Sequence, residues 1–251
     1  MKVISLGWGV QSFTMAAMSA LGELEPVDYM IHADTTHEAS WTYSFAEKYT
    51  KWLEEHGQKV VTVKNSNVDV VTSGRGGFQI PAYTVTPKGK GQTHRQCTFT
   101  WKIAPMRRWL QLNRNKQNVE QWIGISWDES QRMKDSDTKY ITHRWPLIEK
   151  KMTRLDCKHW LESHNIEIPK RSSCVFCPYH SSHEWRDIKQ SNFGDWEKAV
   201  NVDNEIRKVY PPYDLFVHPS RKPLDEVDFR TQEEKGQMTL WDAECSGMCG
   251  V

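Results

Sequence analysis

A short glycine turn near the start of the chain constrains the fold most strongly. The turn occupies residues 5–12 (SLGWGVQS), between an apolar run at residues 2–4 and a helical pattern at residues 13–18. Glycine in such a turn lets the backbone approach a ligand closely, and the free N–H groups of the following helix face an anion held there. The turn therefore predicts a phosphate site, although a plain tight turn fits the same pattern. The residues predicted to bind the phosphate are Ser5, Gly7, Gly9, Gln11 and Ser12.

The alternation of strand and helix continues after the turn. An apolar run at residues 27–34 is followed by an amphipathic helix that ends before Gly57, and a further β-rich run occupies residues 59–63. This order predicts a Rossmann-like α/β fold with a parallel sheet, in which ligands bind beyond the carboxyl ends of the strands. Asp34 ends its strand at that edge, where it either caps the next segment or contacts a ribose or a metal ion.

Three further segments follow these elements. Residues 72–94 are rich in glycine, proline and lysine without a sustained period, which predicts a mobile loop; a lid and a disordered excursion both fit this pattern. Residues 100–112 predict a helix and residues 118–125 predict a strand. Beyond that strand, Asp128 and Arg132 belong either to a solvated loop or to a substrate contact.

The chain changes character after Pro146. We predict a nucleotide-binding domain at residues 1–146 and a smaller, mainly helical annex with a C-terminal tail at residues 147–251. Within the annex, residues 220–242 are charged and aperiodic and predict an extended arm.

Composition limits the classes of function and location. The 251 residues carry a net charge of +1, so any polyanion must bind locally, for example at Lys102 and Arg107. Met1 and Lys2 lead directly into a strand, and no stretch is long and apolar enough for a signal sequence or a membrane span. We therefore expect a cytoplasmic protein with no membrane partner, in which the six cysteines bind metal or react as thiols rather than form disulfides.

Two cysteines form a Cys-x-x-Cys turn, which brings two thiolates within reach of one metal ion or cluster. These are Cys174 and Cys177, and they supply half of a site. If the metal is zinc, a nitrogen or sulfur ligand would complete its coordination, whereas an iron–sulfur cluster would be bound by thiolates alone. The remaining candidate ligands are Cys97, Cys157, His180, Cys245 and Cys249.

Residues 95–110 (RQCTFTWKIAPMRRWL) resemble a segment of the adenylylsulfate and phosphoadenylylsulfate (PAPS) reductases, which belong to the PP-loop adenine nucleotide alpha-hydrolase superfamily. In that family a Cys-Cys pair precedes a Lys-Val/Ile-x-Pro-Leu-x-Arg run. The turn at residues 5–12 lies where the family has its phosphate loop, usually Ser-Gly-Gly-x-Asp-Ser. Residues 33–35 and 124–132 are similar to its nucleotide and substrate segments. The resemblance covers most of residues 1–185.

The resemblance implies a set of site residues and cofactors. It implies an alpha-hydrolase-like fold that binds ATP or PAPS through the glycine turn with Asp34, Gly124 and Asp128, with Mg²⁺ as a candidate ion. Lys102 and Arg132 would contact phosphate or sulfate oxygens. The cysteines imply a [4Fe-4S] cluster, with Zn²⁺ as the alternative. Its ligands would be Cys97, Cys174 and Cys177, with Cys157 or an anion in the fourth position.

Several departures from the family pattern keep three functions open. Trp8 and Gln11 replace a glycine and an aspartate of the phosphate loop, and Thr98 replaces one cysteine of the pair. One function is an ATP-dependent enzyme that adenylates an acceptor, with sulfur handled at the cluster. Another is a sulfonucleotide reductase whose nucleophile is Cys245 and which uses a thiol donor. A third is a protein that binds an adenine nucleotide without turnover. The acceptor, a small molecule or a nucleic acid, and a homo-oligomeric state stay open.

Overall fold

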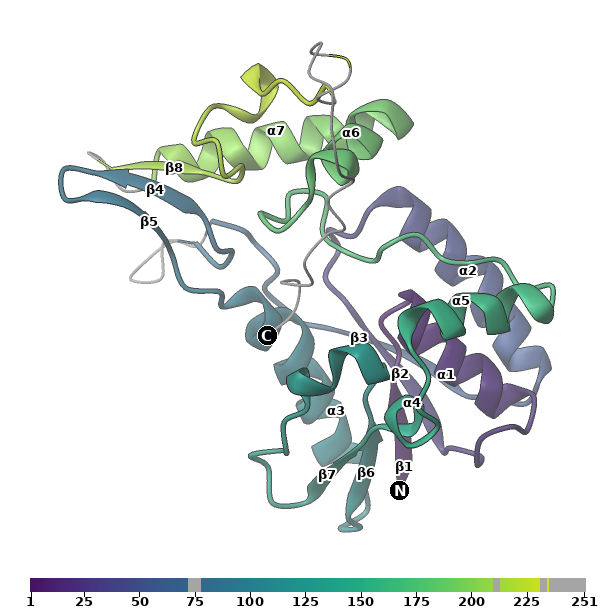
Figure 1. Cartoon of the computed structure of the whole chain (residues 1–251). Coiled ribbons are helices and arrows are strands. Elements are labelled where there is room, and N and C mark those ends of the chain that lie inside the picture. Colours follow the sequence, from purple (N-terminus) through teal and green to yellow (C-terminus); the bar gives the residue numbers. More distant parts are fainter. Residues whose placement is uncertain (72–77, 210–212, 231–233, 235–251) are drawn as a thin grey trace. The chain divides into compact units, whose positions relative to one another are not determined.

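The structure is a computed structural model and describes residues 1–71, 78–209, 213–230 and 234. The chain divides into two compact units (Figure 1). Unit 1 consists of Met1–Val68 and Thr98–Ser173, and unit 2 of Asp69–Cys97 and Cys174–Val251. Within the described residues, no helix combines the length and the apolar character that crossing a membrane requires.

Unit 1 is built on a parallel sheet of five strands, as the alternation of strands and helices predicted. The strand order is β3-β2-β1-β6-β7, and each neighbouring pair is parallel. The strands are β1 (Lys2–Ser5), β2 (Tyr29–Asp34), β3 (Val60–Lys64), β6 (Val119–Trp122) and β7 (Ile141–Arg144). The first two connections carry the chain from β1 outward to β3, and β6 then returns to the other side of β1, which places the order reversal at β1.

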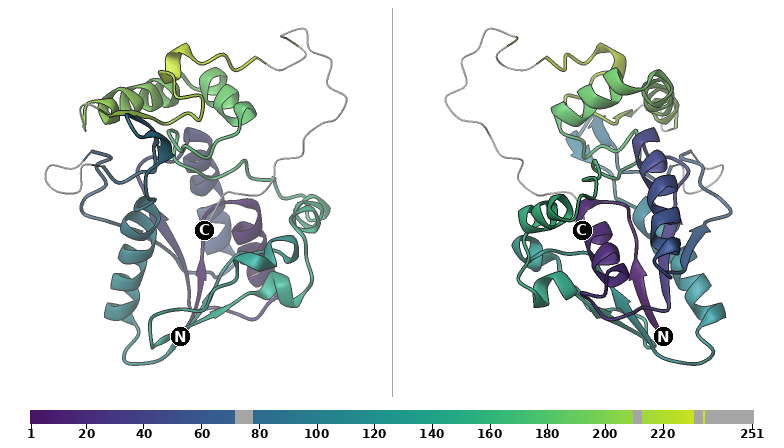
Figure 2. Two further views of the ribbon diagram at one scale, coloured as in Figure 1. Left: turned by 60° about the vertical axis from the view of Figure 1, so that its left-hand side comes forward. Right: turned by 90° about the vertical axis from the view of Figure 1, so that its right-hand side faces the viewer.

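Helices cover both faces of this sheet, so its central strands are buried on both sides. One face packs against α1 (Val10–Ala20), α2 (Ser40–Glu55) and α5 (Arg154–Ser163), with Ile4 and Met30 in that core. The other face packs against α3 (Ala104–Asn113), with Val3 and Ile31 in the second core. The two views of Figure 2 show the same division. Adjacent residues of a strand thus serve opposite cores.

A π-helix, η1 (Thr98–Ile103), runs directly into α3. Together they account for the helix predicted at residues 100–112, and Pro105 lies in the first turn of α3, where its missing N–H costs nothing. Two short helices, η2 (Trp127–Arg132) and α4 (Pro146–Glu149), complete unit 1 after β6 and β7.

Unit 2 combines two helices with a small antiparallel sheet. The sheet order is β5-β4-β8, from β5 (Gly89–Gln92), β4 (Tyr83–Thr86) and β8 (Asp214–Phe216). The helices are α6 (Ser182–Ser191) and α7 (Phe193–Arg207). Their N-cap residues are Ser181 and Asn192, and each cap side chain accepts hydrogen bonds from backbone N–H groups of the first turn.

The mobile loop predicted at residues 72–94 is wrong for its described part. Residues 83–92 form the β4–β5 hairpin, because the run Tyr83 to Thr86 has high β propensity and Gly89 adopts a φ of 125° in the turn. Residues 72–77 lie outside the described residues.

The extended arm predicted at residues 220–242 is also wrong as far as residue 230. Leu224, Val227 and Phe229 are buried, and η3 (Leu224–Glu226) lies in this segment. The buried carboxylate of Asp203 accepts hydrogen bonds from the backbone N–H groups of Val217 (2.9 Å) and Leu224 (3.0 Å). This carboxylate therefore ties the segment to α7.

The division between the units differs from the boundary expected at residue 146. Helix α5 belongs to unit 1, because Cys157 and Leu161 are fully buried in the same core as α1. Conversely, Asp69–Cys97 belongs to unit 2, because β4 pairs with β8.

Candidate functional site

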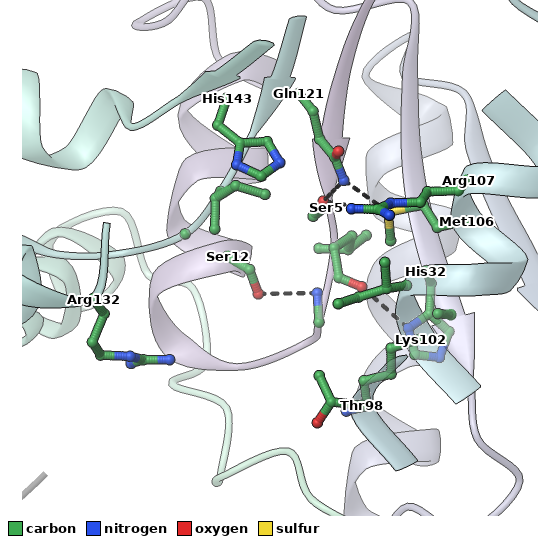
Figure 3. A pocket seen from close by; sticks show the side chains of 16 residues that line it. Ser5, Ser12, His32, Thr98, Lys102, Met106, Arg107, Gln121, Arg132 and His143 are labelled. Carbon is green, nitrogen blue, oxygen red and sulfur yellow. Dashed lines mark hydrogen bonds between the residues drawn. The ribbon is translucent and has the colours of Figure 1, made fainter. Parts of the chain in front are cut away.

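A cavity of about 420 Å³ opens in unit 1 at the carboxyl ends of β1, β2 and β6 (Figure 3). Its volume lies in the range of sites for small ligands. Its wall is formed by Ser5, Leu6, Gly7, Ser12, His32, Ala33, Thr98, Lys102, Ile103, Met106, Arg107, Gln121, Ile123, Gly124, Arg132 and His143.

The glycine turn forms one wall of the cavity and begins α1. The N–H of Gly7 donates to Ser12 Oγ at 3.1 Å, and that hydroxyl group donates to the carbonyl oxygen of Gly9 at 3.3 Å. Gly9 is the N-cap of α1 and offers no capping side chain, so the first N–H groups of the helix keep their capacity for an outside acceptor. Trp8 adopts a φ of 57°, a conformation that glycine adopts more readily.

Gly124 supports the turn from the end of β6. A Cβ atom at this position would lie 2.7 Å from both the N and the Cα of Ser12. Only glycine lets β6 and the start of α1 approach this closely, so Gly124 fixes where the turn lies.

Lys102 reaches the cavity from η1 and is held by a buried carboxylate. Its Nζ lies 3.0 Å from Oε1 of Glu38, whose side chain has no exposed area. Oε2 of Glu38 accepts a second hydrogen bond from Ser172 Oγ at 3.0 Å. Glu38 therefore positions the Lys102 ammonium group, and a buried charge of this kind needs such partners.

Two guanidinium groups add positive charge on opposite sides of the Gly7–Ser12 hydrogen bond (Figure 3). Arg107, on α3, pairs with the exposed Asp137 and lowers the pKa of that carboxyl group. Arg132, on η2, pairs with Glu129 at 2.6 Å. Among the described residues that line the cavity there is no aspartate or glutamate, so the charged side chains of the wall are all cations.

The rest of the wall is largely apolar. Leu6, Ala33, Ile103 and Ile123 contribute hydrocarbon surface. Beside them the Gln121 amide donates to Ser5 Oγ at 2.7 Å and to Met106 Sδ at 3.0 Å. The cavity thus combines cations with apolar surface, an arrangement that suits a flat organic group carrying phosphate or sulfate.

Four residues that the sequence singled out lie elsewhere than in the cavity wall. Gly9 is set back at the helix start. Asp34 Oδ1 accepts hydrogen bonds from the N–H of Thr36 (2.7 Å) and from the Tyr43 hydroxyl group (2.9 Å). The pKa of Tyr43 is raised, mainly by burial and also by its hydrogen bond to Asp34. Asp34 thus follows the capping alternative, because local donors saturate one of its oxygens.

The side chains of Gln11 and Asp128 are also engaged within the protein. Gln11 Nε2 donates to Glu129 Oε2 at 3.1 Å, and its Oε1 accepts from Arg154 Nη1 at 2.7 Å. Asp128 accepts from the backbone N–H of Arg154 at 3.1 Å. Gln11 therefore acts behind the cavity, through the carboxylate that also holds Arg132.

Two histidines of the wall had no signal in the sequence. His32, on β2, is 7% exposed, and its Nδ1 lies 3.1 Å from the Leu6 carbonyl oxygen. His143, on β7, places Nδ1 2.7 Å from the Lys134 carbonyl oxygen. Isolated histidines within strands carry no motif, and β7 itself was not predicted.

The cysteines do not gather into a metal-ion site in the part of the chain that the structure describes. Cys97, Cys174 and Cys177 all belong to unit 2, but no group of three or more His, Cys, Asp or Glu side chains there lies close enough to hold a metal ion. The residues as placed therefore do not fit the predicted centre. Instead, the Cys-x-x-Cys segment forms a turn in which the N–H of Cys177 donates to the Cys174 carbonyl oxygen.

Cys157 is a core residue rather than a ligand. It is fully buried in unit 1, and this burial raises the pKa of its thiol to about 12, so it stays protonated. Metal binding needs the thiolate, which this environment disfavours. Cys245 and Cys249, together with the C-terminal tail, lie outside the described residues.

Comparisons with known proteins return structural likenesses alone. No family model and no curated protein match the chain. A solved PAPS reductase from Candida auris, in a phosphate complex, has 12% identity and a TM-score of 0.46, over 72% of this chain and 82% of that one. The U34-tRNA thiolase NcsA from Methanococcus maripaludis, solved with its [4Fe-4S] cluster, has 14% identity and a TM-score of 0.40, over 83% and 72%.

Proposed function

We propose that the cavity of unit 1 binds an adenine nucleotide and that the protein is a PP-loop enzyme that uses ATP to adenylate an acceptor. The observation that carries this proposal is the convergence of Lys102, Arg107 and Arg132 on a cavity whose wall includes the start of α1. Cations and helix N–H groups stabilise phosphate charge, and the apolar part of the wall can hold a base.

Each group has a separate task in the proposed reaction. The acceptor attacks the α-phosphorus of ATP, a bond to the acceptor forms, and pyrophosphate leaves with the electron pair of the broken P–O bond. The amides at the start of α1 hold the α-phosphate, and the cationic side chains stabilise the charge that moves onto pyrophosphate. Glu38 keeps the Lys102 ammonium group in place.

Binding is tested by calorimetric titration of the chain with ATP, AMP and PAPS, with and without Mg²⁺. Arg107→Gln should weaken binding by about tenfold or more, because it removes one charge-assisted hydrogen bond to phosphate. Its pair with Asp137 is exposed, so the fold should tolerate this change.

The matched control is Arg114→Gln, which removes the same charge just after the same helix. Arg114 stacks 4.1 Å from the Tyr140 ring centroid and is absent from the cavity wall. It should bind as the wild type does. An equal loss of affinity in both variants would mean that positive charge in general, and not the cavity, determines binding. A wild-type chain that binds none of the three nucleotides would refute the proposal.

The second candidate function is sulfonucleotide reduction by Cys245. It is favoured by the cysteine on the C-terminal tail, which the sequence places before Ser246. Incubation with PAPS and a thiol donor separates the two functions. Sulfite release that disappears in Cys245→Ser would support the reductase, whereas pyrophosphate release from ATP that survives in Cys245→Ser would support adenylation. Tight nucleotide binding with neither product would support a binding protein.

The proposed reaction does not use the cysteine-ligated metal centre that the sequence predicted. Protein purified without air should be measured for iron and zinc. Iron in the stoichiometry of a [4Fe-4S] cluster, lost in Cys174→Ser, would restore the sequence prediction and require the cysteines to come together.

A further inference from the structure

The carboxylates around the cavity decide whether the protein can hold a Mg²⁺ ion on the phosphates of a bound nucleotide. In nucleotide sites this ion is bound by phosphate oxygens and water together with one or two protein carboxylates. Among the described residues, no aspartate or glutamate lines the cavity. The two aspartates that the sequence favoured, Asp34 and Asp128, lie outside its wall. The wall as placed therefore lacks the ligand that this ion normally takes from a protein.

Gln11 stands where the phosphate loop that the sequence resembles has its aspartate. Its amide oxygen Oε1 is the side-chain atom that could bind a cation, and it accepts a hydrogen bond from Arg154 Nη1 at 2.7 Å. The amide nitrogen Nε2 donates to Glu129 Oε2 at 3.1 Å. A guanidinium group thus lies next to Oε1, where its positive charge opposes that of a metal ion.

Glu129 is a carboxylate close to this loop, and a cation of the cavity wall already uses its charge. Oε2 of Glu129 accepts a hydrogen bond from Arg132 Nη1 at 2.6 Å, in addition to the bond from Gln11. Arg132 lines the cavity, whereas Glu129 does not. The cavity therefore presents the positive member of this pair.

The same relation holds at the other two cations of the wall. Lys102 pairs with Glu38, and Arg107 pairs with Asp137, and neither carboxylate lines the cavity. A Mg²⁺ ion could gain a ligand from one of these pairs only by displacing the cation. The residues in place therefore do not fit the ion that the family resemblance implies.

We propose that the cavity binds its nucleotide without Mg²⁺ and that Lys102, Arg107 and Arg132 neutralise the phosphate charge directly. This inference rests on the proposed function, because it concerns the same site. A chelated Mg²⁺ ion would cancel part of the phosphate charge and occupy oxygens to which the guanidinium groups otherwise donate. The ligand of the cavity is thus a nucleotide phosphate free of metal, and Mg²⁺ competes with the protein for it.

The test is a calorimetric titration of the wild type with ATP, in EDTA and in Mg²⁺ at matched ionic strength. Mg²⁺ should weaken ATP binding by about tenfold, because the ion takes the place of one charge-assisted hydrogen bond between protein and phosphate. AMP is the matched control ligand, since a single phosphate group chelates Mg²⁺ far more weakly than a triphosphate does. At a Mg²⁺ concentration that saturates ATP but not AMP, the affinity for AMP should not change.

The variant Arg132→Gln tests which group acts in place of the ion. It removes a cation of the wall and releases the Glu129 carboxylate. ATP binding in EDTA should weaken, and the difference between EDTA and Mg²⁺ should become smaller than in the wild type. Lys134→Gln is the matched control, because Lys134 is exposed and absent from the cavity wall, and it should keep the wild-type difference.

Each result of this set decides a different statement. Equal or tighter binding of ATP in Mg²⁺ would overturn the inference while nucleotide binding stands, and this comparison needs no variant. A wild-type difference that persists in a folded Arg132→Gln would overturn the part assigned to Arg132. If ATP binds the wild type in neither condition, the proposed function itself fails, and the inference fails with it.

Discussion

At the scale of single residues, close approach and strain decide where the glycine turn lies. Gly124 leaves no room for a side chain against the backbone of Ser12, and Trp8 holds a left-handed conformation with its indole ring packed against Phe13, His32 and Phe45. The sequence indicated the glycines of the turn through their motif. It carried no signal for Gly124 as a spacer, because that contact joins residues more than one hundred positions apart.

Gly124→Ala should destabilise unit 1 and weaken nucleotide binding. The added Cβ would meet the Ser12 backbone at 2.7 Å, so the start of α1 must shift, at a cost of about 1–3 kcal/mol in the free energy of unfolding. Gly9→Ala is the control, because a Cβ there meets nothing within 4 Å. Urea unfolding of both variants measures the difference, and two equal midpoints would contradict the assigned role of Gly124.

At the scale of elements, an ion pair between the partly exposed Lys102 and the buried Glu38 joins η1 to the segment after β2. Glu38 and Lys102 are 64 positions apart, and their contact brings the cation of the predicted helix to the cavity. Sequence patterns placed Lys102 on a helix near the site but gave no partner for it. Burial of a carboxylate depends on tertiary packing, which no local pattern of residues reports.

Lys102→Met should destabilise the chain by about 1–3 kcal/mol, because it leaves the buried Glu38 carboxylate without its cation. The double variant Lys102→Met/Glu38→Gln should recover at least about 1 kcal/mol of this loss, since a neutral amide is cheaper to bury. Denaturant unfolding of the wild type, both single variants and the double variant gives the coupling. Additive losses would show that the two side chains do not stabilise each other.

Within unit 2, His218 should make stability depend on pH. Burial lowers the pKa of His218 to about 4, while the unfolded chain has the ordinary value near 6.5. Between these values the unfolded state binds more protons, so the free energy of unfolding rises with pH through this window and falls as the pH drops toward 4. His218→Gln should flatten this dependence, whereas His183→Gln, at a side chain that is 80% exposed, should not.

Unfolding midpoints at pH 5 and pH 7 provide the measurement. The wild type should lose more stability than His218→Gln between pH 7 and pH 5. An equal loss in the two proteins would mean that another group governs the acid response.

At the scale of the whole molecule, the parallel sheet was predictable and the division into units was not. The strands and helices over residues 2–63 show clear hydrophobic periodicity in the sequence. Each strand there pairs with the next strand along the chain. Unit 2 instead forms from segments far apart in sequence, because Tyr83 of β4 pairs with Phe216 of β8. Short strands such as β7 and β8 lack a period of their own, and which partner they choose is a tertiary property.

The same limit applies to the site. The motifs placed Ser5, Gly7, Ser12, Lys102 and Arg132 near one ligand, and these residues line one cavity. They also favoured Asp34, Asp128 and Gln11, whose side chains instead bond to Tyr43, the backbone of Arg154 and Glu129. Whether a polar side chain faces the cavity or another part of the protein depends on tertiary packing, which the sequence pattern does not report.

Hydrogen exchange of the backbone amides with and without ATP tests the central claim most directly, because it locates the ligand as well as detecting it. The account predicts slower exchange in the peptides that cover residues 5–13 and 98–107, since a phosphate would bind the first N–H groups of α1 and order the η1–α3 segment beside it. In Arg107→Gln this protection should appear only at higher ATP concentration, whereas Arg114→Gln should match the wild type. Saturating ATP that leaves both peptides unchanged, or that protects only peptides of unit 2, would contradict the account.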